Sequence, residues 1–356
     1  MNWRSRESSF SPRLNWLMRS GIQHPTGAVF AEYDSLTASY KRVSTEAAAW
    51  SIQAVLGLGE PPDETRRNIA ISAGRYLMER SFDLQADLFV NDPTTEPRLG
   101  SFMSGVAALR ALNALSHATG DSAYSECADR CGRSIQVRMT RVDGSFFKQF
   151  NATGGHAGGE GGGPEQLKAS AAFLELAEDA GMAELRNAAE SLLKFALARH
   201  EGFVSEPSPN LESRLSKLRR YALFLEGLLP FAAERIEAGS VLQAGIISLE
   251  QEAKDIDPEQ LPPELLAQPL RLRLFADQMG LGELDRSRAE FEADLLREYQ
   301  LQSSDPSLEG AFGAVRDTTE IGASLEPHPT VVSLQALEFW TDATSDGFRR
   351  TWRDLI

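Results

Sequence analysis

The feature that most constrains this fold is a turn motif that recurs along the chain at a nearly constant interval. In each copy a Gly or Asp lies close to a Phe, at residues 27–30, 87–89, 144–146, 202–203 and 310–312. Successive phenylalanines of the motif are 59, 57, 57 and 109 residues apart, and the last interval is about twice 55. A degenerate copy is therefore expected near residue 257. Six units of roughly 56 residues result, and a fixed period of this length is typical of repeat architectures.

Every unit has the same internal plan, in which an apolar helical segment is followed by a more polar, amphipathic one. The apolar segments are predicted at 45–58, 101–118, 165–180, 213–229, 263–279 and 330–341. The amphipathic segments are predicted at 63–79, 121–138, 183–199, 232–251, 283–300 and 345–355, and residues 11–19 are expected to complete the ring beside the last of them. Runs that alternate with period two are few, so strands are expected to be almost absent.

Two helices in each of six units predict an all-α chain of about twelve helices. With the apolar helices inside and the amphipathic helices outside, they form a closed (α/α)6 toroid, predicted to be one domain over residues 1–356. An open helical solenoid is the alternative. The number six and the meeting of both ends of the chain favour closure. The phenylalanines of the motif are predicted to plug the gaps between neighbouring hairpins.

The connections are unequal in length, and this inequality predicts which end of the ring carries the function. Within a unit the helices are joined by about two to five residues, whereas long connections lie at 20–44, 81–100, 139–164, 200–212, 252–262 and 301–329. In an α/α ring the long connections emerge at one end, and long loops on a rigid scaffold commonly carry function. The inner helices begin at that end, so their N-termini favour an anionic or polar ligand at the cavity mouth.

Composition limits the partners of the chain. Asp and Glu number 51 against 36 Lys and Arg, and the resulting formal net charge of −15 disfavours nucleic acid. No run approaches the roughly 20 apolar residues of a membrane span, and the first residues lack a secretory apolar core. The two cysteines, Cys127 and Cys131, are expected to be buried thiols on one helix, and a cytoplasmic protein is predicted.

The third long connection contains a glycine-rich stretch, residues 154–163, in which seven residues are Gly. No Gly-Lys-Ser/Thr follows it and no strand is expected before it, so it matches neither a P-loop nor a dinucleotide-binding fingerprint. Two interpretations stay open. The stretch is either a flexible surface loop or a mobile lid that brings His156 or Glu160 over the cavity.

The two ends of the repeat resemble a known family. The stretches that carry the resemblance are residues 20–34, Tyr40, 44–50, 310–312 and 331–337. They resemble the first loop and the closing hairpin of bacterial six-hairpin glycosidase-like proteins, which are often associated with surface-polysaccharide metabolism. The resemblance matches Tyr33, Asp34 and Glu46 to the family pattern and implies carbohydrate chemistry in the central cavity. The fold alone does not choose among glycoside hydrolases, polysaccharide lyases, epimerases and uronate-acting enzymes.

Glycoside hydrolysis requires two carboxyl groups, one protonated and one ionised. Glu46 is a candidate at the start of the first inner helix, because a helix N-terminus stabilises a carboxylate and suits a base or nucleophile. Its candidate partners are Asp34, Asp143, Glu165 and Glu309. The alternatives are structural: Thr45 and Glu46 cap the helix, and Asp34 forms a turn.

A lyase or an epimerase instead requires a base that removes a proton beside a carboxylate, and cations that stabilise the enolate. The candidate bases are Tyr33, Tyr40 and His156, and the candidate cations are Arg214, Arg219 and Arg316, because arginine suits bidentate carboxylate binding. Each arginine has the alternative of a salt bridge within the chain, and Arg219 or Arg220 must point inward or pair with a carboxylate. Further substrate contacts are predicted for His24, Trp50, Lys148 and Arg220.

No metal or cofactor is expected, because no spacing of His, Asp and Glu fits a known ligand set. The sequence therefore predicts a carbohydrate-active protein that acts on or binds an oligo- or polysaccharide in the central cavity, uronate-containing ones included, as a hydrolase, lyase or epimerase. The competing prediction is a non-catalytic scaffold of polysaccharide biosynthesis that binds a glycan or a protein partner. Residues 252–282 contain only one weak copy of the repeat and favour this second prediction. The sequence leaves the oligomeric state open.

Overall fold

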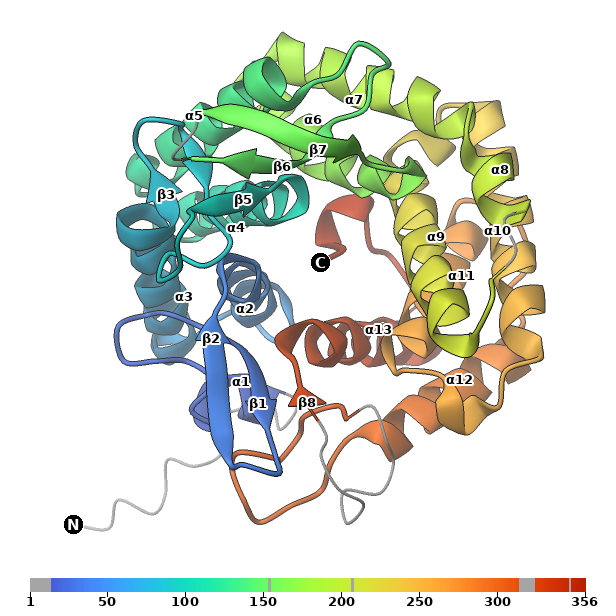
Figure 1. Cartoon of the computed structure of the whole chain (residues 1–356). Coiled ribbons are helices and arrows are strands. Elements are labelled where there is room, and N and C mark those ends of the chain that lie inside the picture. The colour runs from blue at the N-terminus through green and yellow to red at the C-terminus, as the bar shows by residue number, and fades with distance from the viewer. Residues whose placement is uncertain (1–13, 153–154, 206–207, 314–323, 346) are drawn as a thin grey trace.

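A computed structural model describes residues 14–152, 155–205, 208–313, 324–345 and 347–356. Its helices form two concentric rings, which Figure 1 shows along the ring axis. The inner ring contains α2 (Thr45–Gly57), α4 (Phe102–Thr119), the 3-10 turn η4 (Pro164–Ala169) with α6 (Ser170–Asp179), α9 (Leu211–Ala232), α11 (Glu264–Gln278) and α13 (Pro327–Ser345). The outer ring contains α3 (Glu64–Tyr76), α5 (Ser122–Met139), α7 (Ala183–Leu197), α10 (Ile236–Lys254) and α12 (Arg286–Tyr299). The predicted (α/α)6 toroid is confirmed.

Short polar side chains determine where helices begin. The residues before α2, α3, α4, α9 and α12 each accept a hydrogen bond from the N–H three residues further on, and they are Ser44, Asp63, Ser101, Asn210 and Asp285. Such caps satisfy N–H groups that have no partner within the helix. Because Ser44 caps α2, the capping role considered for Thr45 and Glu46 is wrong. The Thr45 hydroxyl donates instead to the carbonyl of Val90 at 2.5 Å.

The phenylalanine turns join the outer helices to the hairpins that follow them. After α5 and α12 the first residue beyond the helix pairs with the phenylalanine of the turn in an isolated antiparallel bridge. The side chains of Phe89, Phe146 and Phe312 are each 1% exposed. They are therefore buried in the core, as the repeat predicts. The side chain of Phe203 lies outside the part of the chain that the structure describes.

The predicted sixth outer helix at 345–355 is wrong. After α13 the chain turns inward, and residues 347–356 lie at the centre of the ring with a short 3-10 turn, η6 (Trp352–Asp354) (Figure 1). Phe348 packs against Phe275 and Phe339, with ring centroids 5.1 and 5.3 Å apart. Arg350 also pairs with Asp342 at 2.7 Å. Because these contacts lie on α11 and α13, they hold the segment, called here the inner tail, inside the ring.

The sixth outer position is filled by the short helix α1 (Asn15–Arg19), within the segment that was predicted to complete the ring. A bridge between Gln23 and Val29 follows α1, as similar bridges follow α5 and α12. Trp16 on α1 donates its ring N–H to the carbonyl of Ser307 at 3.0 Å. The two ends of the repeat therefore meet, as closure requires.

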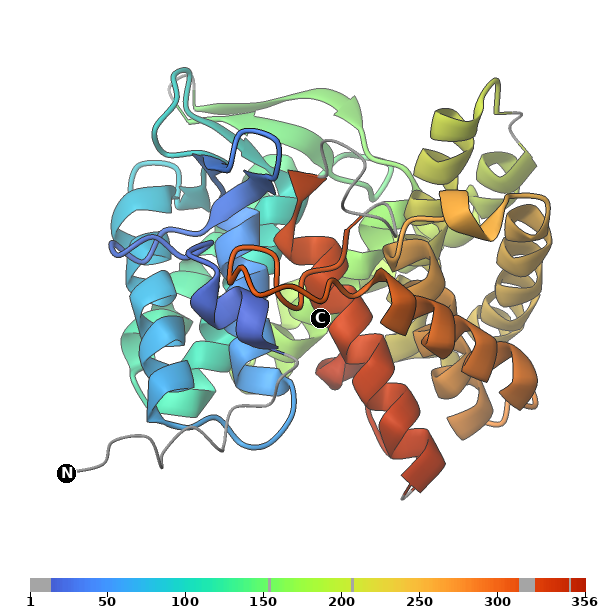
Figure 2. The ribbon, with the colours of Figure 1, turned by 90° about the horizontal axis from the view of Figure 1, so that it is seen from below.

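The long connections form small antiparallel sheets, whereas strands were predicted to be almost absent. One sheet has the order β2 (Ser39–Val43), β1 (Phe30–Asp34), β8 (Ser324–Leu325), and another has the order β5 (Leu99–Ser101), β6 (Phe147–Asn151), β7 (His156–Gly161). A two-stranded sheet pairs β3 (Phe82–Asp83) with β4 (Leu88–Phe89). Figure 2 shows the strands gathered at one end of the ring. Most of the glycine-rich stretch is strand β7, because β6 offers its backbone N–H and C=O groups along that edge.

The two cysteines are buried free thiols on α5, as predicted. Burial raises the pKa of the Cys127 thiol to about 12 and that of Cys131 above its usual value, so both thiols are protonated and unreactive at neutral pH. In the described residues, no helix combines the length and the apolar character needed to cross a membrane.

Candidate active site

A cavity of about 340 Å³ opens at the end of the ring where the long connections lie. Its wall comes from three inner helices and from strand β8 and residues near it. The lining residues are Arg219, Leu223, Pro262, Pro263, Glu264, Gln268, Phe312, Ser324, Glu326, His328 and Pro329. This group is called the mouth cavity below. The end of the ring that was expected to be functional therefore has a cavity with titratable side chains.

Helix α2 brings an acid and an aromatic ring to the same end. Glu46 lies in its first turn and Trp50 one turn later, so both side chains lie on one face of the helix. The Trp50 ring contacts the His328 ring, with centroids 4.4 Å apart. Trp50 therefore links α2 to His328 of the mouth cavity, and Glu46 lies one turn before Trp50 on the same helix; these three residues are called the acid–base row.

Glu46 is a weaker acid than its position at a helix N-terminus predicts. Burial raises the pKa of its carboxyl group from 4.5 to about 7, although the Ser104 hydroxyl donates to Oε2 at 3.4 Å. The hydrogen bond from Ser104 offsets only part of the effect of the lost water. With a pKa near 7 the Glu46 carboxyl group is partly protonated at neutral pH, so it can donate a proton as well as accept one.

The pKa of His328 is shifted in the opposite direction, below its usual value. Burial lowers the pKa of its imidazole to about 4, and the positive charge of Arg271 acts in the same direction. At neutral pH the ring is therefore uncharged and can accept a proton. His328 was not among the predicted site residues, because the sequence places it in the long connection 301–329 and indicates no partner for it.

The remaining polar groups of the mouth cavity come from α9, α11 and the start of α13. Arg219 donates to Glu264 at 2.6 Å, which confirms that this arginine pairs with a carboxylate. Gln268 is 1% exposed, and its Oε1 has no hydrogen-bond partner among the described residues. Glu326 is exposed at the mouth, and loss of water together with the charges of Glu264 and Glu32 raises its pKa.

Beneath the mouth cavity lies a buried charge network. Lys168 donates to Glu226 at 2.9 Å, and Arg271 pairs with the other oxygen of the same carboxylate. Arg271 also donates to Gln335 at 2.6 Å, and the Lys168 ammonium reaches the carbonyl of Ile356 at 3.3 Å. The network therefore anchors the inner tail directly below the mouth cavity.

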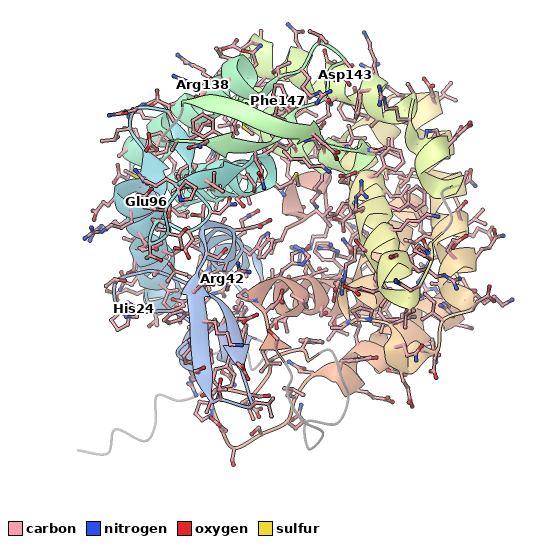
Figure 3. The ribbon with its side chains drawn as sticks, viewed as in Figure 1. His24, Arg42, Glu96, Arg138, Asp143 and Phe147 are labelled. Atoms are coloured by element: carbon pink, nitrogen blue, oxygen red, sulfur yellow. The ribbon has the colours of Figure 1, made fainter. Side chains whose placement is uncertain are left out.

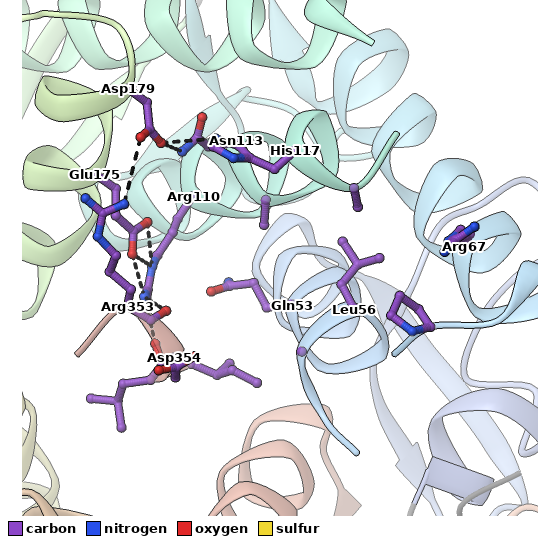
Figure 4. Close-up of a pocket in the computed structure, with 16 residues that line it drawn as sticks. Gln53, Leu56, Arg67, Arg110, Asn113, His117, Glu175, Asp179, Arg353 and Asp354 are labelled. Atoms are coloured by element: carbon purple, nitrogen blue, oxygen red, sulfur yellow. Dashed lines mark hydrogen bonds and ion pairs between the residues drawn. The ribbon is translucent and has the colours of Figure 1, made fainter. Parts of the chain in front are cut away.

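A second cavity, of about 550 Å³, lies on the other side of the inner tail, where the inner helices end (Figure 4). Arg110 binds Glu175 at 2.8 Å and donates to the carbonyl of Arg353 at 2.8 Å. Asp179 accepts from Asn113 at 2.8 Å. Because the inner tail contacts both this cavity and the buried network, it separates the two ends of the ring.

Several predicted site residues belong to the β1–β2 hairpin. Tyr33 is buried against Tyr40, with ring centroids 4.8 Å apart, and the Tyr40 hydroxyl donates to the carbonyl of Ser20. Asp34 accepts from two backbone N–H groups of its turn and pairs with Lys41 at 2.6 Å, so its pKa falls to about 2. The turn-forming alternative for Asp34 is confirmed. In the described structure these three residues stabilise the hairpin.

Other predicted residues lie elsewhere in the ring. Figure 3 shows His24 and Asp143 toward the outside, and Lys148 is exposed on β6. Arg220 pairs with Glu165 at 3.2 Å, Arg214 with the end of α10, and Glu309 accepts from the backbone of Ser303 within its own loop. The side chain of His156 and the whole of Arg316 lie outside the described residues. Of the predicted residues, Arg219 lines the mouth cavity, and Trp50 contacts it through the ring of His328.

The residues that the sequence analysis missed are charged or amide side chains on the inner helices. They are Lys168, Glu226, Glu264, Gln268, Arg271, His328 and Gln335. Their signal is a polar residue within an otherwise apolar helix, as in Glu226 of the stretch 221–229. Among the described residues, no three His, Cys, Asp or Glu side chains are grouped so that they could hold a metal ion.

The fold is shared with solved enzymes that act on sugars. A cellobiose 2-epimerase from Bacillus thermoamylovorans B4167 superposes with a TM-score of 0.68 at 12% identity, over 93% of this chain and 98% of that one. A D-mannose isomerase gives 0.68 at 10% identity, over 91% and 95%. An unsaturated glucuronyl hydrolase specific for heparin gives 0.63 at 9%, over 95% and 97%. No protein-family model and no curated protein sequence matches the chain. The chain therefore shares the (α/α)6 toroid fold of these enzymes.

Proposed function

We propose that this protein is a carbohydrate-active enzyme that moves protons on a sugar bound in the mouth cavity. The observation that carries the proposal is the acid–base row. The pKa of Glu46 is raised to about 7, so a large fraction of its carboxyl groups is protonated at neutral pH, and His328 is uncharged and free to accept a proton. Trp50 lies between them and offers an aromatic face, the surface on which a sugar ring stacks.

Among reactions of sugars, this row favours epimerisation or isomerisation. In the open-chain form, His328 takes the proton from the carbon beside the carbonyl group, and Glu46 gives its proton to the carbonyl oxygen. The product of this step is an enediol, and return of the protons to different positions gives an epimer or a keto isomer. The structural neighbours named as an epimerase and an isomerase support the same chemistry.

The alternatives that the sequence raised have less support. Arg214, Arg219 and Arg220, which could grip a uronate, are each paired with carboxylates of the chain. A lyase would need such cations free to stabilise an enolate. A hydrolase would need an ionised carboxylate opposite Glu46. The resemblance of the first loop further suggests that the substrate belongs to surface-polysaccharide metabolism.

The experiment is proton exchange in D2O. Purified protein is incubated with reducing mono- and disaccharides, and proton NMR follows the loss of the hydrogen beside the anomeric carbon and the growth of new anomeric signals. We expect exchange with the intact chain and a loss of about 100-fold or more in Glu46→Gln and in His328→Gln. Glu64→Gln is the matched control, because Glu64 occupies the first turn of the outer helix α3.

Three other results of this experiment would contradict the proposed function. Release of a monosaccharide from a glycoside without exchange would replace the proposal by a hydrolase. Binding of sugars with neither exchange nor cleavage would favour the non-catalytic glycan-binding scaffold. Full activity in both variants would exclude the acid–base row as the catalytic group.

A further inference from the structure

An ion pair in the wall of the mouth cavity leaves the terminal nitrogens of an arginine without a protein partner. Arg219 on α9 and Glu264 at the start of α11 both line the cavity, and Nε of Arg219 donates to Glu264 at 2.6 Å. Most N–H donors of a guanidinium are on its two terminal nitrogens rather than on Nε. In the described part of the chain, no hydrogen bond or ion pair involves these two nitrogens of Arg219. They are therefore available to a ligand that accepts hydrogen bonds.

Glu264 determines where this guanidinium lies. The Glu264 side chain is 7% exposed and that of Arg219 is 45% exposed, so the carboxylate is the buried member of the pair and the guanidinium is the member that a ligand can reach. Burial has the largest effect on the pKa values of His328 and Glu326, and the charge of Arg219 lowers both, so the guanidinium lies close to both side chains. An arginine held through Nε is suited to bind two neighbouring oxygens of a sugar with its terminal nitrogens.

The Arg219–Glu264 pair has no net charge, and the other charges around it are mostly negative. Burial raises the pKa of Glu326 at the mouth, and the carboxylates of Glu264 and Glu32 act in the same direction. The opposing cations are Arg219, which Glu264 holds, and Arg42, which is exposed on β2, where water screens its charge. A ligand carboxylate would therefore meet three protein carboxylates around one neutralised arginine.

Two of the helix N-termini do not supply the partial positive charge that was predicted for the cavity mouth. Glu264 occupies the first turn of α11, where its carboxylate offsets the charge of the helix end. Helix α13 begins with Pro327, and Pro329 follows two residues later, so neither of these residues contributes an N–H. An anionic group would therefore find few backbone donors at these two helices, and a polar, uncharged ligand is favoured.

We propose that the mouth cavity selects uncharged sugars and that the Arg219–Glu264 pair determines this selection. The terminal nitrogens of Arg219 donate to hydroxyl and carbonyl oxygens of the bound sugar, while Glu264 holds the guanidinium in place and cancels its charge. Sugars that carry a carboxylate are repelled by Glu264 and Glu326. This inference rests on the proposed function, since it names the substrate class of the same cavity.

The test removes the charge of Glu264, which should convert the pair into a site for a uronate. Glu264→Gln keeps the shape of the side chain and an oxygen that accepts from Nε of Arg219, but it leaves the guanidinium charge uncancelled. Calorimetric titration compares glucose with glucuronate at low ionic strength. With the intact chain, we expect glucose to bind at least about tenfold more tightly than glucuronate. With Glu264→Gln, the affinity for glucuronate should rise at least about tenfold and that for glucose should change by less than about threefold.

Two further variants assign the effect to the pair. Arg219→Gln, at an exposed position, is expected to weaken glucose binding about tenfold, because charge-assisted hydrogen bonds are lost. In the double variant with Glu264→Gln, the gain in affinity for glucuronate should disappear. Glu190→Gln is the matched control, since it removes one carboxylate from an ion pair with Arg235 at 2.5 Å on the outer helix α7, and it should keep the preference of the intact chain. Urea unfolding establishes that each variant is folded before titration.

The results that overturn the inference differ from those that overturn the proposed function. Glucuronate that binds the intact chain as tightly as glucose, or a preference that stays unchanged in Glu264→Gln, refutes selection by this pair. If Glu264→Gln does not fold, a change in glucose affinity below about threefold in Arg219→Gln refutes it instead. The inference also fails if neither sugar binds at millimolar concentration. The proposed function is decided separately, by whether Glu46→Gln and His328→Gln lose proton exchange on a reducing sugar.

Discussion

Replacement of Glu46 by Gln is expected to stabilise the protein at alkaline pH while removing its activity. Few substitutions at a partly buried position stabilise a fold, because they commonly leave a cavity or a polar group without a partner. Glu46→Gln keeps the shape of the side chain and can still accept from the Ser104 hydroxyl. What it removes is a negative charge that the fold holds away from water.

The size of the effect follows from the pKa of Glu46. The folded chain raises this pKa from 4.5 to about 7, so the folded state binds the proton more tightly than the unfolded state does. The stability that the group contributes is complete below pH 4.5 and is lost as the pH rises through 7. The full shift corresponds to about 3 kcal/mol. Because the side chain is only partly buried, we expect the variant to gain about 1–2 kcal/mol at pH 8.

Urea unfolding at pH 5 and at pH 8 measures this difference. At pH 5 the intact chain and Glu46→Gln are expected to unfold at similar urea concentrations, whereas at pH 8 the midpoint of the variant should be higher with an unchanged slope. Glu64→Gln, in the first turn of an outer helix, should not reproduce the gain. A loss of stability at pH 8, or an equal gain at both pH values, would refute the argument that burial sets the protonation of Glu46.

Two further substitutions test the buried network and the repeat turn by the same urea method. Glu226→Ala leaves the charges of Lys168 and Arg271 buried without a carboxylate, so it is expected to cost about 3–5 kcal/mol. A cost below about 1 kcal/mol would mean that water reaches these cations. Gly27→Ala is expected to destabilise more than Gly120→Ala. Both glycines have positive φ, at 87° and 73°, but a Cβ at Gly27 would lie 2.2 Å from a carbonyl oxygen of α3, whereas the position at Gly120 is open. Equal effects would contradict the close approach at Gly27.

The ring could be predicted because its signals are local and repeated. Each unit repeats an apolar helix, an amphipathic helix and a phenylalanine turn, and a helix pattern is visible without knowledge of distant contacts. The burial of Phe89, Phe146 and Phe312 follows from the same repetition. Closure of the ring could also be predicted, because six such units bring the N-terminal and C-terminal parts of the chain side by side.

The strands and the inner tail could not be predicted in the same way, because each depends on partners far along the chain. Strand β7 is largely glycine, which has a low intrinsic preference for strands, and it forms because β6 lies beside it. The inner tail has an amphipathic pattern suited to an outer helix. The segment lies inside the ring instead, where Arg110 donates hydrogen bonds to the carbonyls of Arg353 and Leu355. Arg110 is more than 240 residues away from both in sequence.

The acid–base row shows why residue type and position in a motif were insufficient to find the candidate site. Glu46 was selected for its place at a helix N-terminus, but its proton affinity is determined by the loss of water around it. His328 has a low pKa because the fold buries it and because Arg271 lies close enough to act on it. Arg271 is held by Glu226 and also donates to Gln335, which in turn holds the inner tail. The proton-accepting state of His328 is therefore a property of the closed ring, which no single stretch of sequence contains.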